Sequence, residues 1–337
     1  MKAVVISKFG PAEVMQWSDV PRPVPGDGEV LIRVHAVSVN RTLDISVREG
    51  NYPLKPALPH ILGVDPSGEI AEIGPGVTTR AVGDRVAVSP MVAMATANEP
   101  PRMLGVNVPG GYAEYVKVPA SITYIVPDEL DFARATVVSR HVPTALHLLR
   151  DRAKVAEGEW VLVLGAAGGL GAAGIQVAKM LGARVIAGCG SARRVEAAME
   201  LGADAGLDYG SEDLAAEVMR ITGGAGANVV FANMGNPDLF SASIDAMARF
   251  GRLISAGAHG GGVVNLDMQK LYLRQLQIIG ATGQKPEDVN LGLEYAATKG
   301  LKMLIDRVLP LEKAIEAHRI VENRGELGKI ILSPVMT

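Results

Sequence analysis

The pattern of hydrophobic and polar positions along the chain changes near residue 128. Before it, short β-branched runs with alternating polar positions are separated by glycine and proline; they cover residues 1–7, 29–39, 67–74, 84–90 and 110–119. Such runs predict strands joined by turns, and together they predict a small antiparallel barrel or sandwich. The segment RTLDISVREG predicts one short helix within it.

After residue 128 the pattern becomes an alternation of apolar strands and amphipathic helices. The expected strands are residues 160–165, 184–189, 205–209, 228–233, 251–257 and 276–282. Six strands joined by helical crossovers predict a doubly wound parallel sheet, so the fold class is α/β. The tail, residues 309–332, predicts a helix and then a strand that returns to the first domain. We therefore expect one domain from residues 1–127 plus 284–337 and a second from residues 128–283.

A glycine-rich turn, GAAGGLGAAG at residues 165–174, joins the first of these strands to a helix. Gly165 allows a tight turn, Gly168 lets backbone approach a pyrophosphate, and Gly171 lets the helix pack against the sheet. The helix N-terminus adds free N–H groups and a positive dipole end. We interpret the turn as a dinucleotide site; the alternative is close packing alone.

The end of the next strand indicates which dinucleotide binds. NAD sites usually place an acidic residue there for the ribose hydroxyls, but residues 187–194 read AGCGSARR and contain no acid. Ser191, Arg193 and Arg194 suit a 2′-phosphate, through a hydroxyl donor and guanidinium charge. NADPH is therefore the expected cofactor; alternatively, both arginines belong to a solvated helix face.

Composition excludes several other classes of protein. The 337 residues carry a net charge of −3, so no basic excess suggests nucleic acid as the main partner. One cysteine, Cys189, excludes a disulfide framework and a four-cysteine zinc site. We find no signal-peptide pattern and no apolar run of about 18 residues, so we expect no membrane association and a cytoplasmic protein.

Several segments in combination resemble one known family. They are VSVNRTLD, LGVDPSGEIAEIG, GGYAEYV, the long stretch around GAAGGLGAAG, and the closing GELGKIIL. Together they are similar to the medium-chain dehydrogenase/reductase superfamily, and best to its zinc-independent quinone oxidoreductase branch. The resemblance implies a GroES-like β-barrel domain followed by a Rossmann NADP-binding domain.

Zinc-dependent members of this superfamily carry a cysteine after the third strand and a Gly-His-Glu sequence about 25 residues later. This chain has Asn40 at the first place and Gly63-Val64-Asp65 at the second, with no nearby cysteine cluster. His60 and Asp65 do not build a tetrahedral zinc site. We expect no metal, and hydride delivery to an electron-poor acceptor in place of alcohol oxidation.

The resemblance also implies roles for individual residues. Asn40 and Tyr52 match pocket residues and are the candidate catalytic pair: Asn40 for a substrate carbonyl, Tyr52 for stacking or proton donation. Each has a structural alternative, since Asn40 can hold its own turn and Tyr52 can cap the turn after residue 50. Asp44 is expected to pair with a nearby arginine, and the alternative is that it performs acid–base work. The candidate cofactor-binding residues are Thr144, Gly165, Gly168, Gly169, Leu170, Gly171, Ser191, Arg193, Arg194, Tyr209 and Gly257.

Three basic residues depart from the family pattern. Arg41 stands where the branch usually has proline, and Arg140 and His141 stand where relatives are small or apolar. They are candidate binding residues for an anionic substrate such as a carboxylate or an acyl-CoA. The alternative is a set of surface ion pairs.

Three functions are therefore open. The first is an NADPH-dependent reductase of quinones or α,β-unsaturated carbonyl compounds, with a small molecule as electron acceptor. The second is reduction of an enoyl-CoA or a 2-alkenoate, and the third is an NADPH-binding structural or regulatory protein. The apolar sixth strand would lie at a sheet edge, and relatives pair it across a dimer, so a homodimer is expected.

Overall fold

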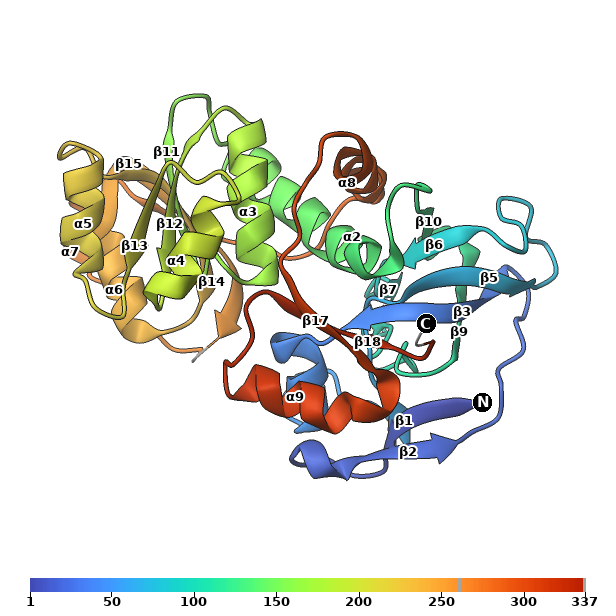
Figure 1. The fold of residues 1–337 in the computed structure, drawn as a ribbon. Helices are drawn as coiled ribbons and strands as arrows, with labels where there is room; N and C mark the ends of the chain where they lie inside the picture. The colour runs from blue at the N-terminus through green and yellow to red at the C-terminus, as the bar shows by residue number, and fades with distance from the viewer. Residues whose placement is uncertain (260–261, 336–337) are drawn as a thin grey trace. The chain divides into compact units, whose positions relative to one another are not determined.

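A computed structural model describes residues 1–259 and 262–335. The chain divides into two compact units (Figure 1). The barrel unit comprises residues 1–140, 289–300 and 305–337, and the parallel-sheet unit comprises residues 141–288 and 301–304. The first division falls inside helix α2, Phe132–Leu146, whereas the sequence pattern places its boundary at residue 127.

The barrel unit is built from the short, turn-separated strands that the sequence predicts. Its main sheet has the order β10-β6-β5-β3-β18-β17, with β9 also paired to β3. The bounds are β3 Glu29–Ser38, β5 Ser67–Ile73, β6 Arg85–Val88, β9 Tyr115–Pro119, β10 Thr123–Ile125, β17 Ile305–Pro310 and β18 Lys329–Ser333. Smaller sheets are formed by β1 Lys2–Ile6, β2 Met15–Asp19 and β4 His60–Ile61, and by β7 Met91–Ala93 with β8 Arg102–Met103.

The C-terminal strand returns to the barrel, as the sequence predicts. β18 pairs antiparallel with β3, where Ile331 lies opposite Ser38, and parallel with β17. Helix α9, Ala314–Glu322, contributes Ala317 and Val321 to the apolar core that also contains Val37 and Leu62. This pairing brings residue 329 beside residues 39 and 40, nearly 290 positions earlier.

The predicted helix after β3 is also present. Residues Arg41–Ile45 form a π-type turn that continues into α1, Ser46–Arg48. Helix α8, Pro286–Thr298, begins in the last residues of the parallel-sheet unit, and the rest of it belongs to the barrel unit.

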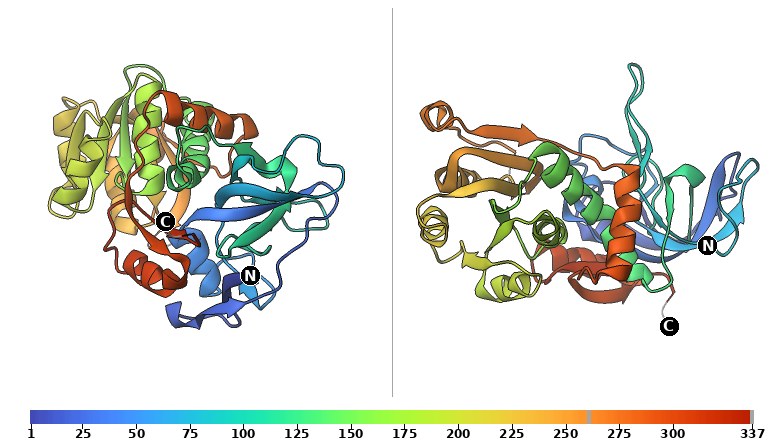
Figure 2. Two further views of the ribbon diagram at one scale, coloured as in Figure 1. Left: turned by 45° about the vertical axis from the view of Figure 1, so that its right-hand side comes forward. Right: turned by 90° about the horizontal axis from the view of Figure 1, so that it is seen from above.

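The parallel-sheet unit contains all six predicted strands, every neighbouring pair parallel, in the order β13-β12-β11-β14-β15-β16. The strands are β11 Trp160–Leu164, β12 Arg184–Cys189, β13 Ala205–Asp208, β14 Ala227–Met234, β15 Met247–His259 and β16 Gln277–Gly280. The helices are α3 Gly169–Met180, α4 Ala192–Met199, α5 Leu214–Ile221, α6 Pro237–Ala246 and α7 Met268–Leu273. Figure 2 shows this unit from two further directions.

Alternate strand residues of this sheet face different helices. Leu162, Leu164 and Val230 pack in one core with Leu214 of α5 and Ile244 of α6. Phe231, the neighbour of Val230, instead lies against α3. Strands buried on both faces explain the near-continuous apolar runs, and the prediction of a doubly wound sheet is confirmed.

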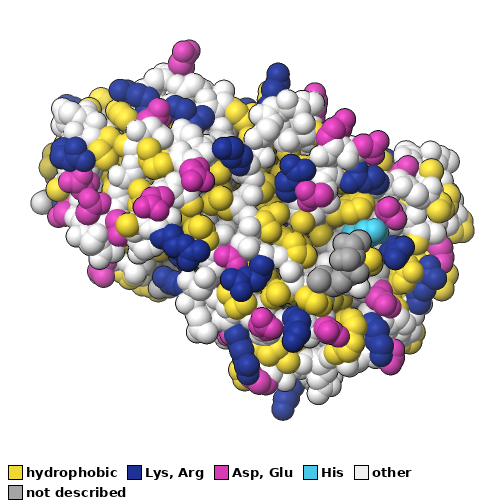
Figure 3. Space-filling model, in the orientation of Figure 1, with side chains coloured by type: hydrophobic (Ala, Val, Ile, Leu, Met, Phe, Trp, Pro, Cys, Tyr) yellow, Lys and Arg dark blue, Asp and Glu magenta, His cyan; other side chains and the backbone are white. Residues whose placement is uncertain are grey.

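The surface matches the near-neutral composition. Lysine and arginine are interspersed with aspartate and glutamate over the face shown in Figure 3. In the described residues, no helix is both long and apolar enough to cross a membrane.

Candidate active site

The glycine-rich turn lies where the sequence places it, between the end of β11 and the start of α3. Gly165 has a φ of +62°, a conformation that favours glycine. Gly168 caps α3 with no side chain, and the first helical hydrogen bond runs from Ala172 N to Gly168 O at 2.8 Å. The N–H groups of Gly169, Leu170 and Gly171 therefore have no acceptor within the helix and are suited to an anion.

The glycines of this segment have different structural roles. A Cβ on Gly168 would meet only the oxygen of Gly165, at 3.2 Å, so the space beside it stays open for a ligand. A Cβ on Gly171 would lie 2.2 Å from that same oxygen, so the prediction that Gly171 packs against the sheet is wrong: it packs against the turn itself. The close contact with the sheet is made by Gly174, whose Cβ would lie 2.6 Å from the Phe231 ring. Gly174 is the last residue of the GAAGGLGAAG segment and is not among the glycines predicted to bind the cofactor.

The end of β12 carries the residues expected to bind a 2′-phosphate. Ser191 is the N-cap of α4 and makes no side-chain capping bond, so its hydroxyl is not used by the helix. Arg193 is exposed and Arg194 half-buried. The nearest acid in the sheet register is Asp208, opposite Cys189, and its Oδ1 accepts the Gly210 N–H of its own turn at 2.9 Å.

Other predicted cofactor residues lie in the same unit. The Tyr209 ring lies over Gly190, and its hydroxyl donates to Met234 Sδ at 3.5 Å. Thr144, which is nearly buried in α2, donates to Gln284 Oε1 at 3.4 Å. Gly257 lies in β15, where its carbonyl accepts a bond from Ser255.

Asn40 belongs to a buried polar cluster in the barrel unit. Its Nδ2 group faces Ser38 O at 3.3 Å, Ser38 Oγ at 3.2 Å and Asp65 Oδ2 at 3.1 Å. Asp65 is fully buried and also accepts the Ser38 N–H at 2.9 Å and the Ser38 hydroxyl at 2.6 Å. The Asn40 amide hydrogens are thus already directed at acceptors of the protein.

Lys329 completes this cluster and was missed by the sequence analysis. Its ammonium donates to Asn40 Oδ1 at 2.8 Å and to Val39 O at 2.6 Å, and the residue is only 7% exposed. The available signal was the lysine in an otherwise apolar strand, GKIIL. A surface position is the usual expectation for such a lysine, and only the pairing of β18 with β3 reveals the contact.

Asp44 is the second buried carboxylate of the cluster. It accepts the backbone N–H of Asn40 at 2.7 Å and of Gly63 at 3.0 Å. The expectation of an arginine partner is therefore corrected: backbone donors hold this side chain. Burial, reinforced by the charge of Asp65, raises the pKa of Asp44 to about 7, against the lowering effects of these hydrogen bonds and of Lys329.

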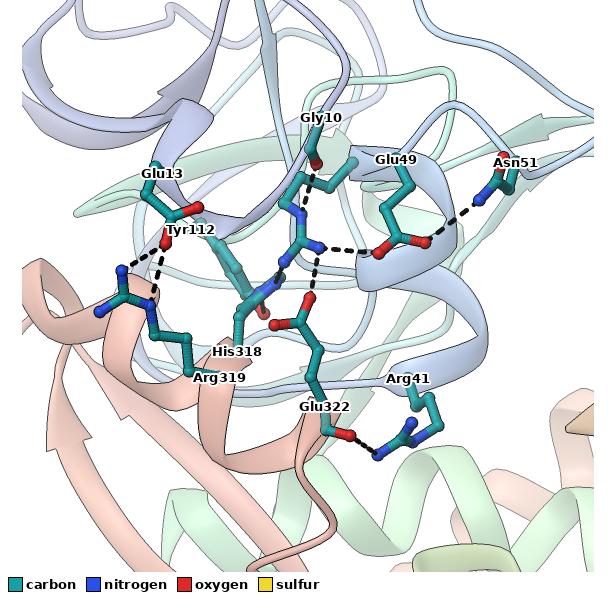
Figure 4. A network of polar contacts seen from close by, with 10 residues as sticks. Gly10, Glu13, Arg41, Glu49, Asn51, Tyr112, His318, Arg319 and Glu322 are labelled. Atoms are coloured by element: carbon teal, nitrogen blue, oxygen red, sulfur yellow. Dashed lines mark hydrogen bonds and ion pairs between the residues drawn. The ribbon is translucent and has the colours of Figure 1, made fainter. Parts of the chain in front are cut away.

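The predicted basic residues have separate surroundings. Burial lowers the pKa of Arg140, which lies near Tyr52 and near the charges of Asp65 and Asp44. Arg41 donates through Nη2 to the backbone oxygen of Glu322 at 3.1 Å (Figure 4). His141 follows Arg140 in α2. Tyr52 is half-buried against the barrel core, so the structure brings Asn40, Tyr52 and Arg140 to one region of the barrel unit.

A second buried polar network of the barrel unit is centred on Arg48 and His318. Arg48, fully buried, donates to His318 Nδ1 at 3.0 Å, and also to Gly10 O, Glu49 and Glu322. The other ring nitrogen of His318 lies 3.1 Å from the hydroxyl of Tyr112, which is itself near the charges of Asp44 and Asp65. Figure 4 shows His318 beside Tyr112, with Glu322 and Glu49 nearby.

Comparison with known proteins identifies the family. An alcohol dehydrogenase GroES-like domain model matches residues 26–128, and a zinc-binding dehydrogenase model matches residues 169–298. A quinone oxidoreductase of Sus scrofa is 31% identical over 338 residues, covering 98% of this chain and 97% of the relative. The chain belongs to the medium-chain dehydrogenase/reductase superfamily. Within it, the chain falls in the quinone oxidoreductase branch.

Other members of the superfamily differ in their described cofactors. An NAD-dependent alcohol dehydrogenase of Sulfolobus acidocaldarius is 30% identical, covering 98% of this chain and 99% of the relative. A solved NAD-dependent alcohol dehydrogenase has a TM-score of 0.92 at 37% identity, covering 99% of both chains. A mycobacterial protein solved in complex with NADPH has a TM-score of 0.84 at 30% identity, covering 99% of this chain and 100% of that one. This member is therefore an oxidoreductase of a nicotinamide-dependent family.

The residues present do not fit the catalytic zinc of the metal-dependent members. At the positions compared above, Asn40 offers an amide already bonded on both sides, and Val64 offers no donor. The one carboxylate there, Asp65, lies close to the positive charges of Lys329 and Arg140, which disfavour a divalent cation. Among the described residues, no group of three or more histidine, cysteine, aspartate or glutamate side chains suits a metal ion.

Proposed function

We propose that this oxidoreductase is a zinc-independent, NADPH-dependent reductase of quinones or α,β-unsaturated carbonyl compounds. The observation that carries the proposal is the buried cluster at Asn40, where two cationic side chains lie near Asp65. An alcohol dehydrogenase needs a Lewis acid to stabilise an alkoxide. A quinone or enone is electron-poor enough to accept a hydride without one, so the donor set favours such an acceptor.

NADPH fits the residues of the parallel-sheet unit. The N-terminus of α3 and the open side of Gly168 suit its pyrophosphate, and Ser191, Arg193 and Arg194 suit its 2′-phosphate. When bound, the cofactor supplies a hydride from its nicotinamide ring. The barrel residues then bind the acceptor: Tyr52 offers a ring for stacking and a phenol as proton donor, and Arg140 offers positive charge for a developing oxyanion.

Replacement of Arg194 by alanine tests the choice of cofactor. The variant loses a guanidinium for the 2′-phosphate, so we expect kcat/KM for NADPH to fall about 10- to 100-fold while that for NADH changes little. Arg220→Ala is the matched control, because Arg220 is an exposed arginine of the same unit paired with Glu217. An unchanged ratio of the two values in Arg194→Ala would contradict the cofactor assignment.

The acceptor is tested by following NADPH oxidation with a quinone, a neutral enone, a 2-alkenoate and an enoyl-CoA. Turnover of the first two supports the proposal. The half-buried guanidinium of Arg140 gives the second candidate, a reductase of 2-alkenoates or enoyl-CoA esters, a specific basis. That candidate predicts a preference for the charged compounds that Arg140→Ala abolishes. Tight NADPH binding with no turnover of any acceptor would favour a non-enzymatic role.

We also propose that the protein forms a homodimer through the edge of its parallel sheet. β16 is the last strand of the sheet and carries the exposed Ile278, and α7 beside it exposes Met268, Tyr272 and Leu273. Exposed apolar side chains at an unpaired strand edge favour association.

A further inference from the structure

The ammonium of Lys329 occupies a position that is unusual for a lysine. Its two hydrogen-bond acceptors, Asn40 Oδ1 and Val39 O, are both neutral. A buried ammonium is unfavourable unless opposite charge lies nearby. Here that charge comes from Asp65 and, when it is ionised, from Asp44; both are fully buried, and both oppose the lowering of the Lys329 pKa that burial causes. Lys329 is therefore the internal counter-ion of two carboxylates as well as a hydrogen-bond donor.

The bonds of Lys329 also determine which way the Asn40 amide points. A lysine ammonium only donates hydrogen bonds, so the Asn40 atom facing it must be Oδ1. A carboxylate only accepts, so the atom facing Asp65 must be Nδ2. The two contacts therefore require the same amide orientation from opposite sides, independently of how oxygen and nitrogen are assigned.

We propose that Lys329 is a positioning residue of the active site, which fixes the Asn40 amide and supplies positive charge beside Asp65 where the zinc-dependent members of the superfamily bind their metal. The inference rests on the proposed function, because it assigns the role to a pocket that binds the acceptor. It also explains the disagreement between the zinc-binding dehydrogenase model and the donor set: a side-chain cation of β18 replaces the metal's charge. Its effect on the acceptor passes through Asn40 and the neighbouring charges.

Replacement of Lys329 by methionine keeps the length of the side chain and removes its charge. We expect kcat for the accepted quinone or enone to fall about 10- to 100-fold, as is usual when a residue that orients an active-site group is lost. The KM for NADPH should stay within about twofold, because the cofactor residues belong to the other unit. Lys117→Met is the matched control, since Lys117 is a half-exposed lysine of the same unit paired with Glu29.

A double-mutant cycle separates positioning from a general loss of structure. If Lys329 acts through Asn40, Asn40→Ala combined with Lys329→Met should lower kcat little more than either change alone. Multiplicative effects of the two substitutions would overturn the proposal. The proposal would also be overturned if Lys329→Met lowered kcat no more than the control Lys117→Met does.

A stability measurement tests the charge assignment without any turnover. Lys329→Met should lower the urea midpoint of unfolding, and adding Asp65→Asn should recover at least half of the loss, because the pair of changes removes one charge of each sign. No recovery would overturn the counter-ion role even if the enzyme proves inactive on every acceptor.

Zinc alone, titrated into the wild-type protein, should not bind at one equivalent. Binding that Asn40→Ala abolishes would overturn both this inference and the zinc-independent function.

Discussion

At the scale of single residues, the hydrogen bonds from Arg48 through His318 to Tyr112 run in one direction. Arginine only donates, so His318 Nδ1 must accept and the proton of the neutral ring sits on Nε2. That N–H donates to the oxygen of Tyr112, so the His318 ring is bonded at both nitrogens without a second proton. Arg48 and His318 thus donate in sequence toward Tyr112, and this arrangement keeps the buried His318 ring neutral.

The protonation of His318 makes a prediction about acid stability. Burial, together with the charge of Arg48, lowers its pKa from 6.5 to about 3 in the folded protein. A depressed folded pKa gives stability that is present above pH 6.5 and is lost as the pH falls toward 3. Well below pH 6.5, the titration of His318 alone should lower the free energy of unfolding by about 1.4 kcal/mol for each unit by which the pH falls. Urea unfolding between pH 7.5 and 4.5 measures the slope.

His318→Gln is the comparison, because glutamine does not titrate in this range. The difference in unfolding free energy between wild type and variant should shrink as the pH falls from 6.5. Asp44 contributes in the opposite sense in both proteins, since its raised pKa of about 7 adds stability on acidification. A difference that stays constant over this range would show that His318 does not remain neutral.

The residues that the sequence singles out differ from those it does not in how far away along the chain their contacts lie. Gly165, Gly168 and Ser191 were predicted because strand, turn and helix are contiguous and their spacing has a chemical meaning. Lys329 and His318 contact residues more than 200 positions away. No local pattern distinguishes such side chains from surface residues, and their role follows only from long-range strand and helix packing.

At the scale of elements, α3 contacts its surroundings through two glycines with separable roles. Gly171→Ala places a Cβ 2.2 Å from backbone of the turn, so the turn must move and we expect NADPH affinity to fall at least about tenfold. Gly174→Ala places its Cβ against the buried Phe231 ring, so we expect a loss of about 1 to 3 kcal/mol in unfolding free energy.

The two variants serve as controls for each other. Each gains about 1 kcal/mol of helix propensity from alanine, so this contribution cancels in the comparison. NADPH affinity is measured by fluorescence titration and stability by chemical denaturation. Equal loss of affinity in both variants would mean that α3 moves as one body and that Gly171 has no particular relation to the turn.

Element boundaries show the same dependence on local pattern. All six parallel strands were predicted within a few residues, because each is an apolar run bounded by glycine or by a charged turn. The strand order β10-β6-β5-β3-β18-β17 could not be predicted, because it joins segments from both ends of the chain. Alternation specifies that a segment is a strand, whereas its neighbours depend on packing of the complete barrel unit.

At the scale of the whole molecule, the proposed dimer makes the last prediction. A charge on the edge strand opposes strand pairing, so Ile278→Lys should convert the dimer into a monomer of 35.3 kDa, as measured by light scattering after size exclusion. Val308→Lys is the matched control: Val308 is 45% exposed against 41% for Ile278, and it lies on β17, the last strand of the barrel sheet. The Val308→Lys variant should remain a dimer. Dissociation by Val308→Lys alone would move the interface to the barrel unit, and a monomeric wild-type protein would contradict the dimer itself.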